Sequence, residues 1–456
     1  MARIAKSLFR SFFMVLVATI GLACGLISGL SCSSAPKTPA PQTSPGEPAE
    51  KSLKAQPAAE SNAQGPTATS TEGAAGAKGG NWSAQMQSLS ATLSDLLPLV
   101  ASNAKFNSPD NFERIETSTK NLRQLAHGLS NAQKPNSDPT IKLMSGLFAE
   151  DIERALDTLK SGNRNYARQI LKDTTSYCIQ CHTQTKNGPD FPRLNLNINL
   201  SELSKVEQAE FFTATRQFDR ALEAYLAVLK DQELAKADPF AWEQSARSAL
   251  AIIVRVKNDS KDALALIGKI ETQAALPESM KKSLGKWKLS IQEWRQEVKS
   301  EAKQGTKLEK KAKTPKPEDE IKQAETMILK AKKLQEFPLD HSQDIVYFRA
   351  ASILHNYLQS HSTNNPLGAK SLFLAGVVAE ATRDMNFWTL HESYYEQCIR
   401  AEPHSKQAQT CFDHLRDSIT LGYSGSGGVN IPPEINRRLE GFREAATPKK
   451  LDSQAN

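Results

Sequence analysis

The stretch LKSGNRNYARQILKDTTSYCIQCH, residues 159–182, contains a turn, an amphipathic pattern and the two close cysteines of the chain. Gly162 is expected to end the preceding helix, because glycine readily adopts the left-handed conformation found just past helix ends. From about Asn163, residues at steps of three and four share one face: Ala167, Ile170, Leu171, Thr174, Cys178 and Cys181. This spacing predicts a helix whose inward face ends in a cysteine pair.

Three further amphipathic helices are predicted before this one. The first has its apolar face at Trp82, Met86, Leu89, Leu93, Leu96 and Val100. The second and third begin at Ser108-Pro109 and Asp138-Pro139, where a capping side chain precedes a proline suited to the first helical turn. Because short loops join four amphipathic helices, an antiparallel bundle is predicted over residues 81–195.

The chain after residue 195 has a different pattern of small and large residues. The same gaps occur twice, at Ala209, Phe212, Ala221 and Tyr225, and at Ala251, Val254, Ala263 and Ile267. These spacings resemble the tetratricopeptide repeat (TPR), in which small residues let two antiparallel helices approach. A weaker third match places Ala379, Tyr395 and Pro403 at the offsets of the repeat, with Thr382 and His391 in place of its usual large and small residues. The resemblance implies a groove that docks a protein or peptide partner.

The predicted fold class is therefore all-α, since no run of alternating β-branched residues indicates strands. TPR-like helices are expected in two blocks, 196–298 and 319–423. A charged linker at 299–318 separates the blocks. A tail at 424–456 is expected to contain a short helix from about Pro433.

The N-terminus predicts export from the cytoplasm. Arg3, Lys6 and Arg10 precede the apolar run SFFMVLVATIGLACGLISGL, residues 11–30. A basic segment followed by an apolar run is typical of a secretory signal peptide. An uncleaved membrane anchor is the alternative, because the run is just long enough to span a bilayer.

Small residues before Cys32 and Cys24 resemble the lipobox of bacterial lipoproteins, although both sites lack its usual leucine. Cys32 is the favoured lipidation site, because polar sequence follows it at once, and Cys24 is the alternative. Residues 1–32 are thus expected to be the signal segment. Residues 33–80 are rich in Pro, Ala, Ser, Thr and Gly and predict a disordered tether. The body is expected in the periplasm or cell envelope, lipid-anchored to a membrane.

The charge balance gives no support for nucleic-acid binding. The 456 residues include 57 basic and 50 acidic side chains, which leaves a net charge of +7. This excess is small and scattered, whereas nucleic-acid-binding domains carry a concentrated basic surface. The densest basic run, residues 307–317, is interpreted as a solvated linker.

Cys178-Ile-Gln-Cys181-His182 matches the attachment pattern of c-type haem. In a chain with six cysteines and eight histidines, chance gives this pattern on the order of once in a thousand such chains. Positions i, i+3 and i+4 lie along one helical face, so two thiols and one imidazole can reach a single macrocycle. The alternatives are half of a zinc site, a redox dithiol and a structural disulfide. A zinc site would need further ligands at metal spacing, which the sequence lacks. A structural disulfide leaves His182 unexplained.

A four-helix bundle whose fourth helix ends in C-x-x-C-H resembles the class II cytochromes c, the cytochrome c prime group and its low-spin relatives. The likeness covers residues 82–193 and rests on the 159–182 pattern and the long helix before it. It implies one covalent haem c on Cys178 and Cys181, with His182 as the proximal iron ligand. Lys186 stands where the family commonly has a basic residue, and it would contact the haem edge.

The first helix would supply the opposite face of the haem. Met86 falls where the family has either a bulky apolar residue or a methionine ligand. A thioether ligand raises the reduction potential and suits an electron carrier. The alternative is that Met86 only fills core space, as methionines usually do. The family's arginine one turn earlier is replaced by Trp82, and the aromatic residue before the basic position is replaced by Thr185.

The other methionine, histidine and cysteine candidates are interpreted as structural. Met144 is expected in the core, and His127 is expected to be exposed or capping rather than in contact with haem. Cys398 and Cys411 lie on either side of a predicted turn. In an exported protein they are expected either to form a disulfide or to remain as two buried free thiols. The other histidines have no ligand spacing and are interpreted as structural or solvated.

Three functions follow from these patterns. The leading hypothesis is a tethered c-type cytochrome that transfers one electron and docks a redox partner through its TPR-like domain. The second is a haem protein with an open iron that binds or senses NO or CO. The third is a TPR-like scaffold or assembly lipoprotein in which haem is secondary. No motif indicates catalysis beyond haem chemistry, so an electron carrier or binding protein is expected rather than an enzyme.

Overall fold

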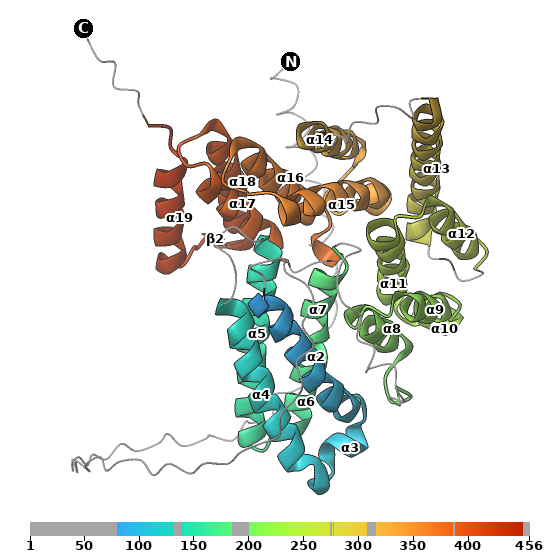
Figure 1. Ribbon diagram of the computed structural model, residues 1–456, viewed down its shortest axis with the longest axis vertical. Coiled ribbons are helices and arrows are strands. Elements are labelled where there is room, and N and C mark those ends of the chain that lie inside the picture. The colour runs from blue at the N-terminus through green and yellow to red at the C-terminus, as the bar shows by residue number, and fades with distance from the viewer. Residues whose placement is uncertain are drawn as a thin grey trace, which may run out of the picture. The chain divides into compact units, whose positions relative to one another are not determined.

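The computed structural model is predominantly helical and describes residues 80–131, 138–184, 200–273, 276, 278–307, 316–385 and 388–449 (Figure 1). This confirms the all-α prediction. The described strands are a two-residue hairpin, β1 (Ser424–Gly425) with β2 (Gly428–Val429). The described residues belong to one unit, Ala75–Asn456. The predicted signal segment, Cys24, Cys32, the tether up to residue 79, Thr185 and Lys186 lie outside the described residues.

The first helical group comprises the helices before residue 183. They are α2 (Gly80–Ala101), α3 (Asn103–Asn107), η1 (Pro109–Asn111), α4 (Phe112–Asn131), α5 (Pro139–Lys160), α6 (Arg164–Asp173) and α7 (Thr175–His182). Helix α2 packs on α4, α4 on α5, and α5 on both α6 and α7 (Figure 1). Their apolar faces meet in a core that includes Leu96, Ile115, Leu122 and Ile152, all almost fully buried.

The predicted helix from Asn163 to the cysteine pair is divided in two at Thr174. The hydroxyls of Thr174, Thr175 and Ser176 donate to the carbonyls three residues earlier, at 2.7 to 2.8 Å. Such back-bonding competes with the regular helical ladder and bends the chain. The cysteine pair therefore lies on a separate short helix, α7, rather than at the end of a continuous one.

The second helical group follows residue 200. It contains α8 (Lys205–Ala214), α9 (Phe218–Leu229), α10 (Gln232–Ala237), α11 (Pro239–Ala251), the π-helical η3 (Ile252–Lys257), α12 (Ser260–Glu271) and α13 (Glu278–Lys307). Helix α8 packs on α9, α9 on α11, and α12 on α13. Ala209, Ala221 and Ala263 are fully buried, as expected for small residues between closely packed helices.

The third helical group begins after residue 315. It contains α14 (Pro317–Leu334), η4 (His341–Gln343), α15 (Asp344–Ser360), α16 (Pro366–Ala381), η5 (Arg383–Met385), α17 (Leu390–Ala401), α18 (Lys406–Gly422) and α19 (Pro433–Ala446). Gly376 of α16 lies close to α17, since an added Cβ at this position would lie 2.5 Å from the Tyr395 ring. A side chain at position 376 would force the two helices apart.

The segment predicted as a charged linker, residues 299–318, is helical at both ends. Helix α13 continues to Lys307, and α14 begins at Pro317. None of the described helices is both long and apolar enough to cross a bilayer.

Buried polar clusters join the three groups. Asp138, the N-cap of α5, accepts hydrogen bonds from the backbone N–H of Thr140 at 2.9 Å and from Tyr394 of α17 at 3.0 Å. Its second oxygen lies 3.0 Å from Nδ1 of His355 on α15. Burial raises the pKa of the Asp138 carboxyl, but the contacts with His355, Thr140 and Tyr394 outweigh it and hold the pKa below its usual range.

A second cluster surrounds Arg247 of α11, whose side chain is fully buried. Its Nε donates to Asp344 of α15 at 2.6 Å, and its two terminal nitrogens donate to Asp384 of η5. Gln244 also donates to Asp384, at 3.0 Å. The two carboxylates compensate the buried guanidinium and fix the second group against the third.

Asp138→Ala is expected to lower the free energy of unfolding by about 3 kcal/mol at pH 7, because it leaves buried partners unpaired and removes a helix cap. The folded-state pKa of Asp138 lies below 3.8, its usual value. The stabilisation that the ionised Asp138 provides is therefore present above pH 3.8 and is lost as the pH falls further. Urea unfolding at pH 7 and at pH 3 measures both effects. Asp157→Ala, at an exposed position of the same helix, is the control. Equal stabilities of the two variants would contradict this account.

Candidate functional site

Helix α7 is held against α5 by Tyr177. The Tyr177 hydroxyl donates to Asp151 at 2.6 Å, and its ring meets Phe148 edge-on with 6.4 Å between centroids. An eight-residue helix has little stability of its own, so such contacts determine where it lies.

Cys178, Cys181 and His182 occupy positions i, i+3 and i+4 of α7, and all three side chains are half-buried. Both cysteines are free thiols. Burial raises the pKa of Cys178 to about 11 and that of Cys181 further. A redox dithiol instead needs one cysteine whose pKa is lowered, so the surroundings of this pair do not favour that alternative.

The imidazole of His182 is oriented by the second helical group. Its Nδ1 lies 2.6 Å from the carbonyl oxygen of Ala214, at the end of α8. Because a carbonyl can only accept, Nδ1 carries the proton and Nε2 carries the lone pair. Burial lowers the pKa of His182 to about 4, against the opposing effect of the Ala214 hydrogen bond. The ring is therefore neutral at pH 7, the form in which histidine binds a metal.

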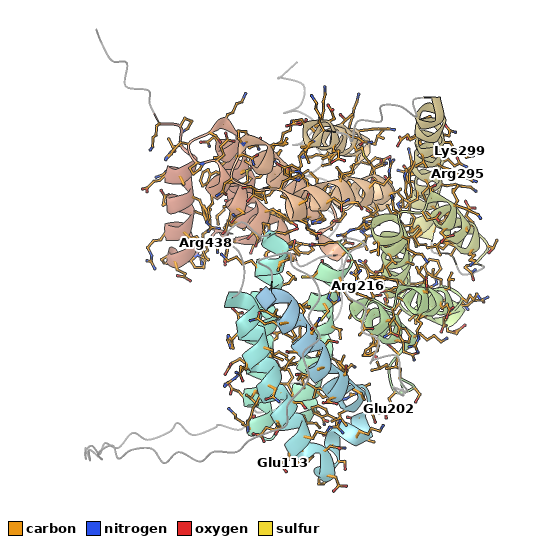
Figure 2. All side chains as sticks on the ribbon, viewed as in Figure 1. Glu113, Glu202, Arg216, Arg295, Lys299 and Arg438 are labelled. Atoms are coloured by element: carbon orange, nitrogen blue, oxygen red, sulfur yellow. A yellow bond between two sulfur atoms is a disulfide. The ribbon has the colours of Figure 1, made fainter. Side chains whose placement is uncertain are left out.

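The turn that follows α8 makes a second contact with α7, through Arg216. Its Nη1 donates to the backbone carbonyl of His182 at 2.8 Å. Arg216 is labelled in Figure 2. Arg216 itself is buried and has a left-handed backbone, with φ of 57°. The turn after α8 thus contacts both the ring and the main chain of His182.

The two central residues of the motif face other elements. Ile179 lines a cavity of about 310 Å³ together with Leu97 and Val100 of α2 and with Phe211 of α8. Gln180 donates to the carbonyl of Met385 in η5 at 2.9 Å. It also lines a small cavity of about 30 Å³ together with His355 and Tyr394.

Met86 and His127 have different surroundings. Met86 is half-buried on α2 and packs against the hydrophobic core, and its role as an iron ligand stays a prediction. His127 is exposed on α4, with Nε2 3.3 Å from Glu153. Met144, expected in the core, is 1% exposed.

The structure joins Cys398 and Cys411 in a disulfide between α17 and α18, with 6.3 Å between their Cα atoms. Every remaining histidine has a protein contact: His341 with Asp384, His355 with Asp138, His361 with Tyr357, His391 with Ser418, His404 with Thr447 and His414 with Glu380. Over the described ranges, no three His, Cys, Asp or Glu side chains are grouped so as to hold a metal ion by themselves.

Sequence reasoning missed Ala214 and Arg216 as residues of this site. They lie 32 and 34 residues after His182 and carry no recognisable motif. No protein-family model, curated protein or solved structure matches this chain.

Alkylation of the haem-free chain distinguishes a poised dithiol from two protonated thiols. A pKa of about 11 in place of 9.0 leaves roughly 100-fold less Cys178 thiolate at pH 8, so iodoacetamide should label Cys178 more slowly in the folded chain than in urea. Peptide mass spectrometry measures both rates. Faster labelling in the folded chain would indicate a redox-active dithiol instead.

Proposed function

We propose that this chain is an exported, membrane-tethered c-type cytochrome that carries one haem c on Cys178 and Cys181, with His182 as the proximal iron ligand. The observation that carries the proposal is the 2.6 Å contact from His182 Nδ1 to Ala214 O. Metal-ligating histidines almost always donate their other ring N–H to a carbonyl or carboxylate. Two free thiols on the same short helix complete the donor set that haem c requires.

Haem, when bound, supplies one-electron chemistry at its iron, and the protein supplies attachment, orientation and environment. Cys178 and Cys181 would hold the macrocycle through thioether bonds, formed when their thiols add across its vinyl groups. The Ala214 carbonyl keeps His182 in the tautomer with its lone pair on Nε2. The chain acts in this proposal as an electron carrier and not as an enzyme.

The finer assignments of the fold belong to the same proposal. The first helical group is the haem bundle of a class II cytochrome, and the second and third groups are TPR-like and dock a redox partner. Lipid attachment at Cys32, or alternatively Cys24, holds the protein to a membrane in the periplasm or cell envelope. Lys186 would contact the haem edge.

Haem staining of a denaturing gel tests the central claim. The parent chain, expressed with its export signal in a host that attaches haem c, should keep a haem stain after denaturation, because thioether bonds survive it. Cys178→Ser with Cys181→Ser should lose the stain. A matched control, Cys398→Ser with Cys411→Ser, should keep it. An unstained parent would overturn the proposal.

An open iron that binds CO or NO is the second candidate, because Met86 packs against the hydrophobic core. A methionine that only fills core space leaves the second axial position of the iron open. Ligation by Met86 instead predicts a six-coordinate, low-spin ferrous spectrum that CO does not change. Met86→Ala should then produce an open, CO-binding iron. Absorption spectra with and without CO measure this. A parent that binds CO at once favours the second candidate, and Met86→Leu controls for lost volume.

A further inference from the structure

We infer that the second helical group forms part of the haem site, with the turn after α8 acting as the outer partner of His182. This inference rests on the proposed function. The Ala214 carbonyl and the Arg216 guanidinium are assigned as positioning groups that set the orientation and basicity of the iron ligand. Both come from the predicted TPR-like region rather than from the first helical group.

The two contacts are complementary. Ala214 O accepts from the ring at 2.6 Å, and Arg216 Nη1 donates to the main-chain carbonyl of the same histidine at 2.8 Å. His182 is the last residue of α7, where helix carbonyls lack intrahelical partners, and a charged donor there is favourable. Ring and backbone are thus fixed to the same turn.

That turn is itself well defined. The N–H of Gln217 donates to Phe212 O at 2.8 Å and that of Arg216 donates to Thr213 O at 3.1 Å. This pair of hydrogen bonds closes a helix with a left-handed residue at the position usually taken by glycine. An arginine in this conformation is less favourable than a glycine, because its Cβ crowds the backbone. The buried Arg216 side chain, directed onto α7, gives a physical reason for an arginine there.

Further contacts hold α8 against the first helical group. Lys172 of α6 forms an ion pair with Glu207 of α8. Glu202, just before α8, accepts hydrogen bonds from the Ser102 hydroxyl and from the Asn103 N–H, the latter at 2.6 Å (Figure 2). The position of the Ala214 carbonyl is therefore coupled to that of the first group at several points.

An acceptor on Nδ1–H makes Nε2 a more basic ligand. A more basic ligand stabilises ferric iron more than ferrous iron and so lowers the reduction potential. A displacement of α8 would weaken this hydrogen bond and raise the potential. The second group thereby acts on the redox properties of the haem as well as on partner docking.

Arg216→Gly tests the assignment without straining the fold, because glycine favours the left-handed turn. In the haem-free full chain, nitrogen-15 NMR should find the single Nδ1–H tautomer of His182 at pH 7 in the parent and a mixture of tautomers in the variant. In the haem-loaded chain, the variant should have a higher reduction potential. Resonance Raman spectra of its five-coordinate ferrous form should show a lower Fe–His stretching frequency. If Met86 ligates the iron, both chains carry Met86→Ala in this measurement. Arg216→Lys should bring the tautomer, the reduction potential and the Fe–His frequency part of the way back to their parent values.

Asn258→Gly is the matched control, because Asn258 also has a left-handed backbone, with φ of 51°, at another helix end. It should leave the tautomer and the potential unchanged. A parent in the Nε2–H tautomer would overturn the inference, as would an Arg216→Gly chain identical to the parent in NMR. The NMR arm needs no haem, so failed haem attachment would count against the proposed function alone.

Discussion

The hydrogen bond from His182 Nδ1 to Ala214 O determines more of this site than any other single contact. It fixes which nitrogen carries the lone pair and gives the half-buried imidazole a partner, while burial keeps the ring neutral. It also ties the end of α7 to the end of α8, so the cysteine motif belongs to two helical groups at once. A histidine held only by its own helix would be free to rotate about its side-chain torsions.

Buried polar clusters serve the fold in the same way elsewhere. Asp138 joins α5 to α15 and α17, and Arg247 joins α11 to α15 and η5. Apolar packing between helices tolerates small slides, whereas a buried carboxylate or guanidinium must meet its partners in one arrangement. These clusters therefore define the register between groups, and the hydrophobic core supplies most of the stability.

The sequence predicted the local features well, because helical periodicity, caps and prolines act over a few residues. Asp138-Pro139 does open a helix, and Ile170 and Leu171 are buried on the predicted face. The break at Thr174 was missed, because three hydroxyl side chains bonding back to the chain leave no mark on apolar periodicity. Arg216 was missed because its partner is distant in sequence and because arginine does not signal a left-handed turn as glycine does.

The geometry of α7 is best understood as imposed by its neighbours. Tyr177 bonds to Asp151 of α5, Gln180 to Met385 of η5, and His182 to Ala214 of α8. These three contacts point in different directions around a helix of two turns, which fixes its rotation as well as its position. Met385 follows Asp384, the partner of Arg247, so the cluster that joins the second and third groups also reaches the motif. The face that bears Cys178 and Cys181 is thus oriented by all three groups together, and the haem site proposed here is a property of their assembly.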